Sequence, residues 1–105
     1  MDVLQGTLDL LILRVLEREP AHGWGIAQRV EQLSRVLRLN QGSLYPALHR
    51  LEDAALIEGD WVIAEETRRR VKEYRLTRAG RRRLGAETRQ WQAYVQAIQL
   101  VLEGA

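Results

Sequence analysis

The residues best suited to chemistry lie in one stretch, residues 40–52, which reads NQGSLYPALHRLE. If residues 41–55 form a helix, Leu44, Ala47, Leu48, Leu51 and Ala55 share one side at about 100° per residue. The other side offers small groups, hydrogen-bonding groups, an aromatic ring and a cation, instead of the Glu and Lys of an ordinary surface helix. Such a face suits the major groove of DNA, where side chains read base edges. This pattern predicts a recognition helix, with Ser43, Tyr45, His49 and Arg50 as its reading side chains. The alternatives are that Ser43 only caps the helix, that Tyr45 packs across its own helix and that His49 is a plain surface residue. Arg50 could read a base, contact a phosphate or be solvated.

Catalytic and metal-binding chemistry find little support. The chain has no Cys, and its two histidines are His22 and His49. His49 and Glu52 form an i, i+3 pair, but two ligands do not make a closed zinc site. The carboxylates form no recognisable acid–base pattern. Gly23 and Gly25 are not expected to follow a strand, so they do not predict a nucleotide loop. We therefore expect no enzyme, no metal and no cofactor.

The cations gather in the second half of the chain. The net charge is only +2, from 16 Lys and Arg against 14 Asp and Glu. Residues 56–64 and 70–76 read as two strands because they are rich in Ile, Val, Trp and Tyr, and a polar segment joins them. The tip of this hairpin is basic on its second arm, which favours phosphate contact by Arg68, Arg69, Arg70 and Lys72, with a solvated surface as the alternative.

Two further helices precede the recognition helix. The first begins at residue 4 or 7 and ends at residue 19, before Pro20. It is apolar on both sides, Leu8, Leu11, Ile12 and Val15 against Leu10 and Leu13, so we expect a partner subunit to cover one side. The second spans residues 25–34, after a loop at residues 22–25, and buries Ile26, Val30 and Leu33. Asn40 or Ser43 is the expected N-cap of the recognition helix, and Pro46 predicts a later start or a bend.

The last helix is expected to begin after Thr77 and to stop at Gly104. Its apolar residues Leu84, Trp91, Val95, Ile98 and Leu102 are spaced 7, 4, 3 and 4 apart, and Tyr94 and Val101 widen the stripe. This spacing is typical of a coiled-coil seam, which predicts packing on the same helix of a second copy. The apolar run at residues 10–16 is far shorter than the roughly 20 residues that cross a bilayer, so no membrane span is expected.

The order helix, helix, helix, hairpin, helix is that of a winged helix-turn-helix, a mainly α (α+β) fold. In such folds the third helix enters the major groove, and here the hairpin would reach the adjacent minor groove or the phosphates. We assign residues 1–76 to the DNA-binding domain and residues 77–105 to a dimerisation helix.

Four segments carry a resemblance to a known family. Residues 22–26 (HGWGI), 42–52 (GSLYPALHRLE), 56–59 (LIEG) and 74–80 (YRLTRAG) look like those of the PadR family of bacterial transcriptional regulators. The GSLYP block is fairly specific to that family, whereas the YRLT…G block is shared by many winged helices. The short chain resembles the subfamily with a single C-terminal helix.

The resemblance implies a homodimeric, repressor-like regulator whose first and last helices form the interface. It also implies DNA contacts at Ser43, Tyr45, Pro46, His49 and the hairpin cations. In some relatives, aromatic residues of the last helix line an effector pocket between subunits. Trp91 is the candidate here, with plain interface core as the alternative.

The sequence therefore predicts a cytoplasmic, bacterial regulator that binds a palindromic operator in double-stranded DNA as a homodimer, with a small hydrophobic or aromatic effector. The alternatives are a winged-helix module that binds protein and a carrier of small hydrophobic ligands. The predicted DNA contacts are Gln41, Ser43, Tyr45, Pro46, His49, Arg50, Arg68, Arg69, Arg70 and Lys72. The predicted dimer contacts are Leu8, Leu11, Leu84, Trp91, Tyr94, Val95, Ile98 and Leu102.

Overall fold

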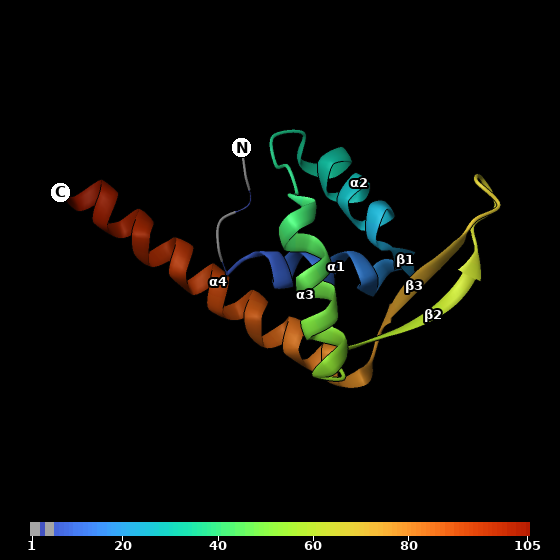
Figure 1. The fold of residues 1–105 in the computed structure, drawn as a ribbon. Coiled ribbons are helices and arrows are strands. Elements are labelled where there is room, and N and C mark those ends of the chain that lie inside the picture. Colours follow the sequence, from blue (N-terminus) through green and yellow to red (C-terminus); the bar gives the residue numbers. More distant parts are fainter. Residues whose placement is uncertain (1–2, 4–5) are drawn as a thin grey trace.

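The computed structural model describes residue 3 and residues 6–105. Three helices form a body from which a β-hairpin projects on one side and a long helix on the other (Figure 1). A three-stranded antiparallel sheet has the strand order β1-β3-β2. In chain order the elements are α1 (Leu8–Arg18), β1 (Ala21–His22), α2 (Gly23–Ser34), α3 (Gln41–Asp53), β2 (Ile57–Ile63), β3 (Arg70–Leu76) and α4 (Arg78–Gly104).

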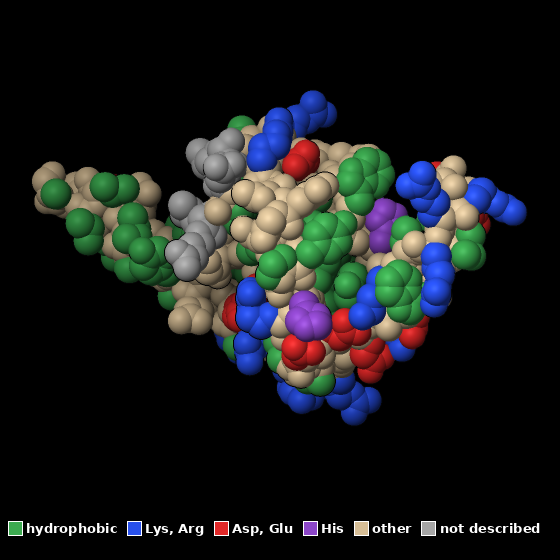
Figure 2. Space-filling model, viewed as in Figure 1, with side chains coloured by type: hydrophobic (Ala, Val, Ile, Leu, Met, Phe, Trp, Pro, Cys, Tyr) green, Lys and Arg blue, Asp and Glu red, His purple; other side chains and the backbone are tan. Residues whose placement is uncertain are grey.

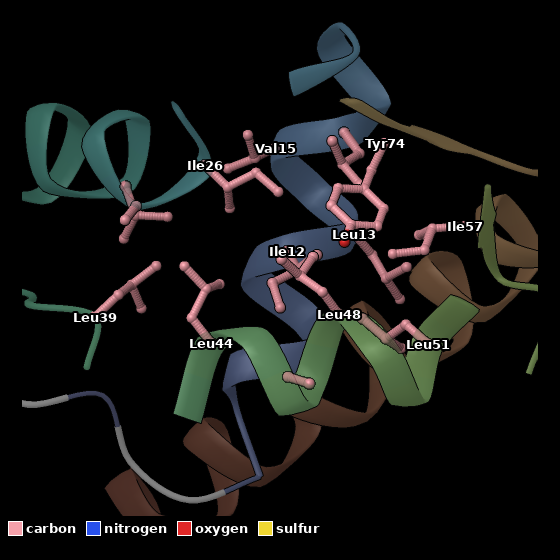
Figure 3. Close-up of a cluster of buried hydrophobic side chains, with 14 of the residues drawn as sticks. Ile12, Leu13, Val15, Ile26, Leu39, Leu44, Leu48, Leu51, Ile57 and Tyr74 are labelled. Carbon is pink, nitrogen blue, oxygen red and sulfur yellow. The ribbon is translucent and has the colours of Figure 1, made fainter. Parts of the chain in front are cut away.

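Helix α1 lies at the centre of the core. Side chains from α1, α2, α3, β2 and β3 meet around it (Figure 3). Ile12 and Leu13, which point to different sides of α1, are both fully buried within the one chain. The Leu13 side is therefore covered by the chain's own elements. Leu8, Leu10 and Leu11 are only half-buried, and the expectation that a partner subunit covers one side of this helix stays a prediction. The alternative helix start at residue 4 lies outside the described residues.

The start of α2 differs from the prediction. The helix begins at Gly23, two residues earlier than expected, because His22 caps it: Nδ1 of the ring accepts the Gly25 N–H at 3.0 Å. Ala21 and His22 pair with β3, so a short strand does precede Gly23, and the expectation of a plain loop is wrong. A nucleotide loop would need a parallel strand–helix–strand unit, and this pairing is antiparallel. Leu33, expected in the core, is 66% exposed near the far end of the helix.

Helix α3 follows its predicted pattern closely. The Asn40 side chain is the N-cap and accepts the Gly42 N–H at 2.7 Å. The four residues Leu44, Ala47, Leu48 and Leu51 are buried. The helix begins at Gln41 and contains Pro46, so the suggestion of a later start is wrong. It ends at Asp53, and Ala55 is exposed in a left-handed turn with φ of 60° instead of continuing the apolar face.

The hairpin and α4 come after α3 in the chain. Strands β2 and β3 pair from Ile57 opposite Leu76 to Ile63 opposite Arg70, one residue shorter at each end of β2 than predicted. Thr77 caps α4 as expected, accepting the Gly80 N–H at 3.0 Å. Helix α4 ends at Gly104, as predicted. Within the described part of the chain, no helix has the length and apolar character needed to cross a membrane.

Candidate nucleic-acid interface

The exposed face of α3 carries the predicted reading side chains. Ser43, Tyr45, Pro46 and His49 are all exposed, opposite the buried leucines. Tyr45 packs over the start of α2, where a Cβ on Gly23 would lie only 2.7 Å from the tyrosine ring. The absence of a side chain at Gly23 therefore lets the ring settle there, and α2 orients it. Nε2 of His49 lies 3.5 Å from a carboxylate oxygen of Asp53 one turn along, and both side chains are open to solvent.

Two of the predicted DNA-binding cations are held in contacts within the chain. The Arg50 guanidinium lies 2.7 Å from the Asp9 carboxylate and joins α3 to α1. The Lys72 ammonium donates to the Glu52 carboxylate at 2.7 Å and joins β3 to α3. This hydrogen bond raises the pKa of Lys72 above its usual value of 10.5. Both cations thus position α3 in the free protein, and their predicted role at DNA stays a prediction.

The Lys72–Glu52 pair sits in a tight junction between the hairpin and α3. A Cβ on Gly59 would come within 2.6 Å of the Lys72 side chain and 3.2 Å of a Glu52 oxygen, so glycine is needed for this approach. Tyr74 is buried beside it, and its burial raises the pKa of the phenol above 10.0. The ammonium also lies 5.7 Å from the centre of the Tyr74 ring. This junction fixes the angle at which the hairpin leaves the body.

The tip of the hairpin offers free positive charge. Among the described residues, Arg68, Arg69 and Arg70 form no ion pair, unlike Arg75, which pairs with Glu58 and Asp60. The guanidinium of Arg70 lies 5.0 Å from the centre of the Trp61 ring. Free cations on long side chains are the groups that contact phosphates.

Figure 2 shows the face that carries α3. Hydrophobic and His side chains lie over the body, and Lys and Arg side chains gather along the hairpin. Two exposed tryptophans have no role in the sequence-based predictions: Trp24, whose ring is stacked on that of His22 with the centres 6.3 Å apart, and Trp61. Trp61 and Ile63 occupy alternate positions of β2 with Ile57, and only Ile57 is buried. The exposure of Trp61 could have been predicted, because the apolar face of this strand is longer than the small core can cover.

The predicted dimer residues fall into three groups, which are exposed, buried and half-buried. Trp91, Tyr94, Val95, Ile98 and Leu102 are exposed along α4, with Leu100 and Val101. Leu84 is only 4% exposed and packs in the chain's own core, so it is not free to join a seam. Leu8 and Leu11 are half-buried against that core. A cavity of about 310 Å³ lies between the start of α1 and α4, lined by Gly6, Thr7, Leu10, Glu87, Gln90, Trp91 and Tyr94.

The order of elements, the capped α3 with an exposed polar face and the basic hairpin define a winged helix-turn-helix protein. No group of three His, Asp or Glu side chains in the described residues is placed to hold a metal ion. Residues 12–86 match the transcriptional regulator PadR-like family. The chain belongs to this family, as the resemblance predicted, and the family consists of transcription regulators, not enzymes.

Solved structures and a relative are similar to this chain. A PadR family transcriptional regulator from Eggerthella lenta superposes with a TM-score of 0.81 at 30% identity, covering 96% of this chain and 86% of the other. A PadR family transcription regulator from hypervirulent Clostridium difficile gives 0.78 at 30% identity, covering 92% and 99%. An uncharacterized protein of Lysinibacillus sphaericus is 28% identical over 104 residues, 98% of this chain and 94% of that protein.

Proposed function

We propose that this regulator binds a palindromic operator in double-stranded DNA as a homodimer and acts as a repressor in the cytoplasm of a bacterium. The observation that carries the proposal is the exposed face of α3 beside the unpaired cations at the hairpin tip. Recognition helices present such polar and aromatic groups to base edges, while cations hold the phosphates. DNA would therefore complement both the exposed face of α3 and the cations of the hairpin tip.

Each part of the interface has its own task in this proposal. Ser43, Tyr45, Pro46 and His49, with Gln41, enter the major groove. Arg68, Arg69 and Arg70 contact the backbone or the minor groove beside it. Arg50 and Lys72 take part through the position they give to α3, since both are already paired with carboxylates. Residues 1–76 serve as the reading domain and residues 77–105 as the dimerisation helix.

The second copy is proposed to pack on α4. Residues 89–105 are all exposed in the single chain, and their apolar side chains recur at coiled-coil spacing. Burial of Trp91, Ile98 and Leu102 against the same residues of a partner removes this apolar surface from water. Two-fold symmetry then places the two copies of α3 about one helical turn of DNA apart, about 34 Å.

An effector site is proposed at the cavity between α1 and α4. Trp91 and Tyr94 line it, with their ring centres 6.2 Å apart, and Leu10 adds an aliphatic wall. A small aromatic or hydrophobic molecule fits this lining. It would release the operator only if it binds the DNA-free arrangement of the two subunits more tightly than the bound one.

Selection from a pool of random DNA duplexes tests the proposal. We expect an enriched motif with two-fold symmetry and half-sites about one helical turn apart. Affinity for the enriched duplex should fall steeply with salt, because cations that contact phosphates displace counterions. Replacing Arg68, Arg69 and Arg70 together by Gln should reduce the slope of log affinity against log salt by about 2 to 3. Recovery of no motif, with weak and salt-independent binding, would favour a protein-binding module.

A further inference from the structure

The outer half of the hairpin carries an apolar surface that the core does not use. Ile57, Gly59, Trp61 and Ile63 alternate along one face of β2, and Tyr74, Lys72 and Arg70 stand opposite on β3. At the base of this face Ile57 and Tyr74 are buried, whereas Trp61 is 59% and Ile63 60% exposed. The face that packs on the body thus continues beyond α3 into solvent, on an edge strand of the sheet. Exposed apolar edge strands invite self-association, so this one calls for a partner.

Arg70 is held over this surface. Its guanidinium lies 5.0 Å from the centre of the Trp61 ring, from the diagonal position across the two strands. A guanidinium on an aromatic face loses rotamer freedom before any ligand arrives. Arg70 has no carboxylate partner among the described residues, so its charge stays available. Lys72, one position nearer the body on the same face, is neutralised by Glu52.

These observations point to one kind of partner. Resting on the proposed function, we infer that Arg70, held by Trp61, reads the minor groove of A·T-rich DNA flanking each half-site. A narrow minor groove, as A·T tracts form, concentrates negative potential that attracts an inserted arginine. Trp61 and Ile63 supply the apolar contact with the sugar walls that minor-groove proteins use. The three unpaired arginines at the tip give this surface the charge that suits DNA and does not suit an apolar protein patch.

The test uses the duplex enriched from the random pool, with its flanks rebuilt in three ways. The flanks are A·T, G·C or I·C, and I·C keeps the minor-groove pattern of A·T while its major groove resembles that of G·C. Binding is measured by fluorescence anisotropy at fixed salt. We expect the wild-type protein to bind the G·C-flanked duplex at least about fivefold more weakly than the other two.

Four variants assign the effect to the pair. Arg70→Ala and Trp61→Ala should bind all three duplexes with equal affinity. Trp61→Phe, which keeps a flat ring, should retain the preference. Arg69→Ala, the matched control without a ring contact, should weaken binding to all three equally. Circular dichroism verifies that each variant is folded.

The outcomes separate this inference from the proposed function. If Arg70→Ala keeps the preference, if I·C flanks behave as G·C flanks, or if wild type shows no preference, minor-groove reading by Arg70 is overturned while operator binding stands. If wild type binds no duplex, both are overturned.

Discussion

Replacing Gly80 with alanine probes how α4 is seated on the DNA-binding body. A Cβ at Gly80 would lie 2.0 Å from the carbonyl oxygen of Leu56 and 2.7 Å from a methyl carbon of Leu76. The Leu76 side chain can turn away, but the Leu56 carbonyl cannot do so freely, because it accepts the Thr77 N–H at 3.2 Å. The Thr77 hydroxyl also donates to the Ala55 carbonyl at 2.8 Å. The first turn of α4 is therefore fixed against the turn that follows α3.

The expected cost follows from these distances. Overpacking in a closed site costs about 1 to 3 kcal/mol, and a contact with hydrogen-bonded backbone places Gly80→Ala at about 3 kcal/mol. The better helix propensity of Ala returns about 1 kcal/mol. The net loss is about 2 kcal/mol, which corresponds to a fall in Tm of roughly 8 to 16 °C for a domain of this size.

Gly85 provides a matched control in the same helix. Among the described residues, a Cβ there meets only the Arg89 guanidinium, at an ordinary 3.5 Å. Gly85→Ala should therefore gain up to about 1 kcal/mol from helix propensity and raise the Tm by up to roughly 4 to 8 °C.

Both variants are compared with wild type by thermal and urea unfolding, followed by circular dichroism. The protein concentration is held constant, because association makes the Tm depend on it. If Gly80→Ala is as stable as Gly85→Ala, then α4 is not packed on the Leu56 carbonyl and the reasoning fails.

Three further predictions concern reading, association and pH. Tyr45→Ala with His49→Ala should abolish preference for the selected duplex while sedimentation still shows the dimer; unchanged preference would remove α3 from the groove. Ile98→Glu should give monomers on sedimentation, because the seam would bury an unpaired charge, and a dimeric variant would exclude α4 as the interface. The pKa values of Lys72 and Tyr74 are both raised on folding, so the folded state holds these protons more tightly and their stabilisation is lost as pH rises. The free energy of unfolding should fall above about pH 10, and Lys72→Met should flatten that decline in urea titrations; a wild-type curve flat to pH 11.5 would contradict this.

The sequence predicted most of the helices because apolar stripes and helix caps depend on residues that are close together in the chain. The stripe of Leu44, Leu48 and Leu51 and the caps at Asn40 and Thr77 depend only on neighbours within a few residues. Strand β1 could not be seen in this way, since two residues are too short to show alternation. The strand exists because β3 offers it an edge.

The sequence could not predict which side chains are exposed or which charges pair, because both depend on contacts in the assembled fold. Leu33 has the spacing of a core residue, yet it is exposed near the end of α2. Arg50 was expected to read a base, contact a phosphate or be solvated, and it pairs with Asp9, which lies 41 residues away in sequence. Which cations were free for DNA was likewise undetermined, because Lys72 looks no different in sequence from the arginines beside it.

In the proposed dimer, the second half of α4 makes folding depend on the concentration of the protein. Residues 89–105 are all exposed in the single chain, and an isolated helix of that length is only marginally stable in water. In the proposed dimer, the order of this segment therefore depends on how many copies the cell holds. Occupancy of a two-half-site operator would then rise roughly with the square of protein level while monomers predominate. A pause in synthesis, followed by dilution through growth, would clear the operator abruptly and without any small molecule.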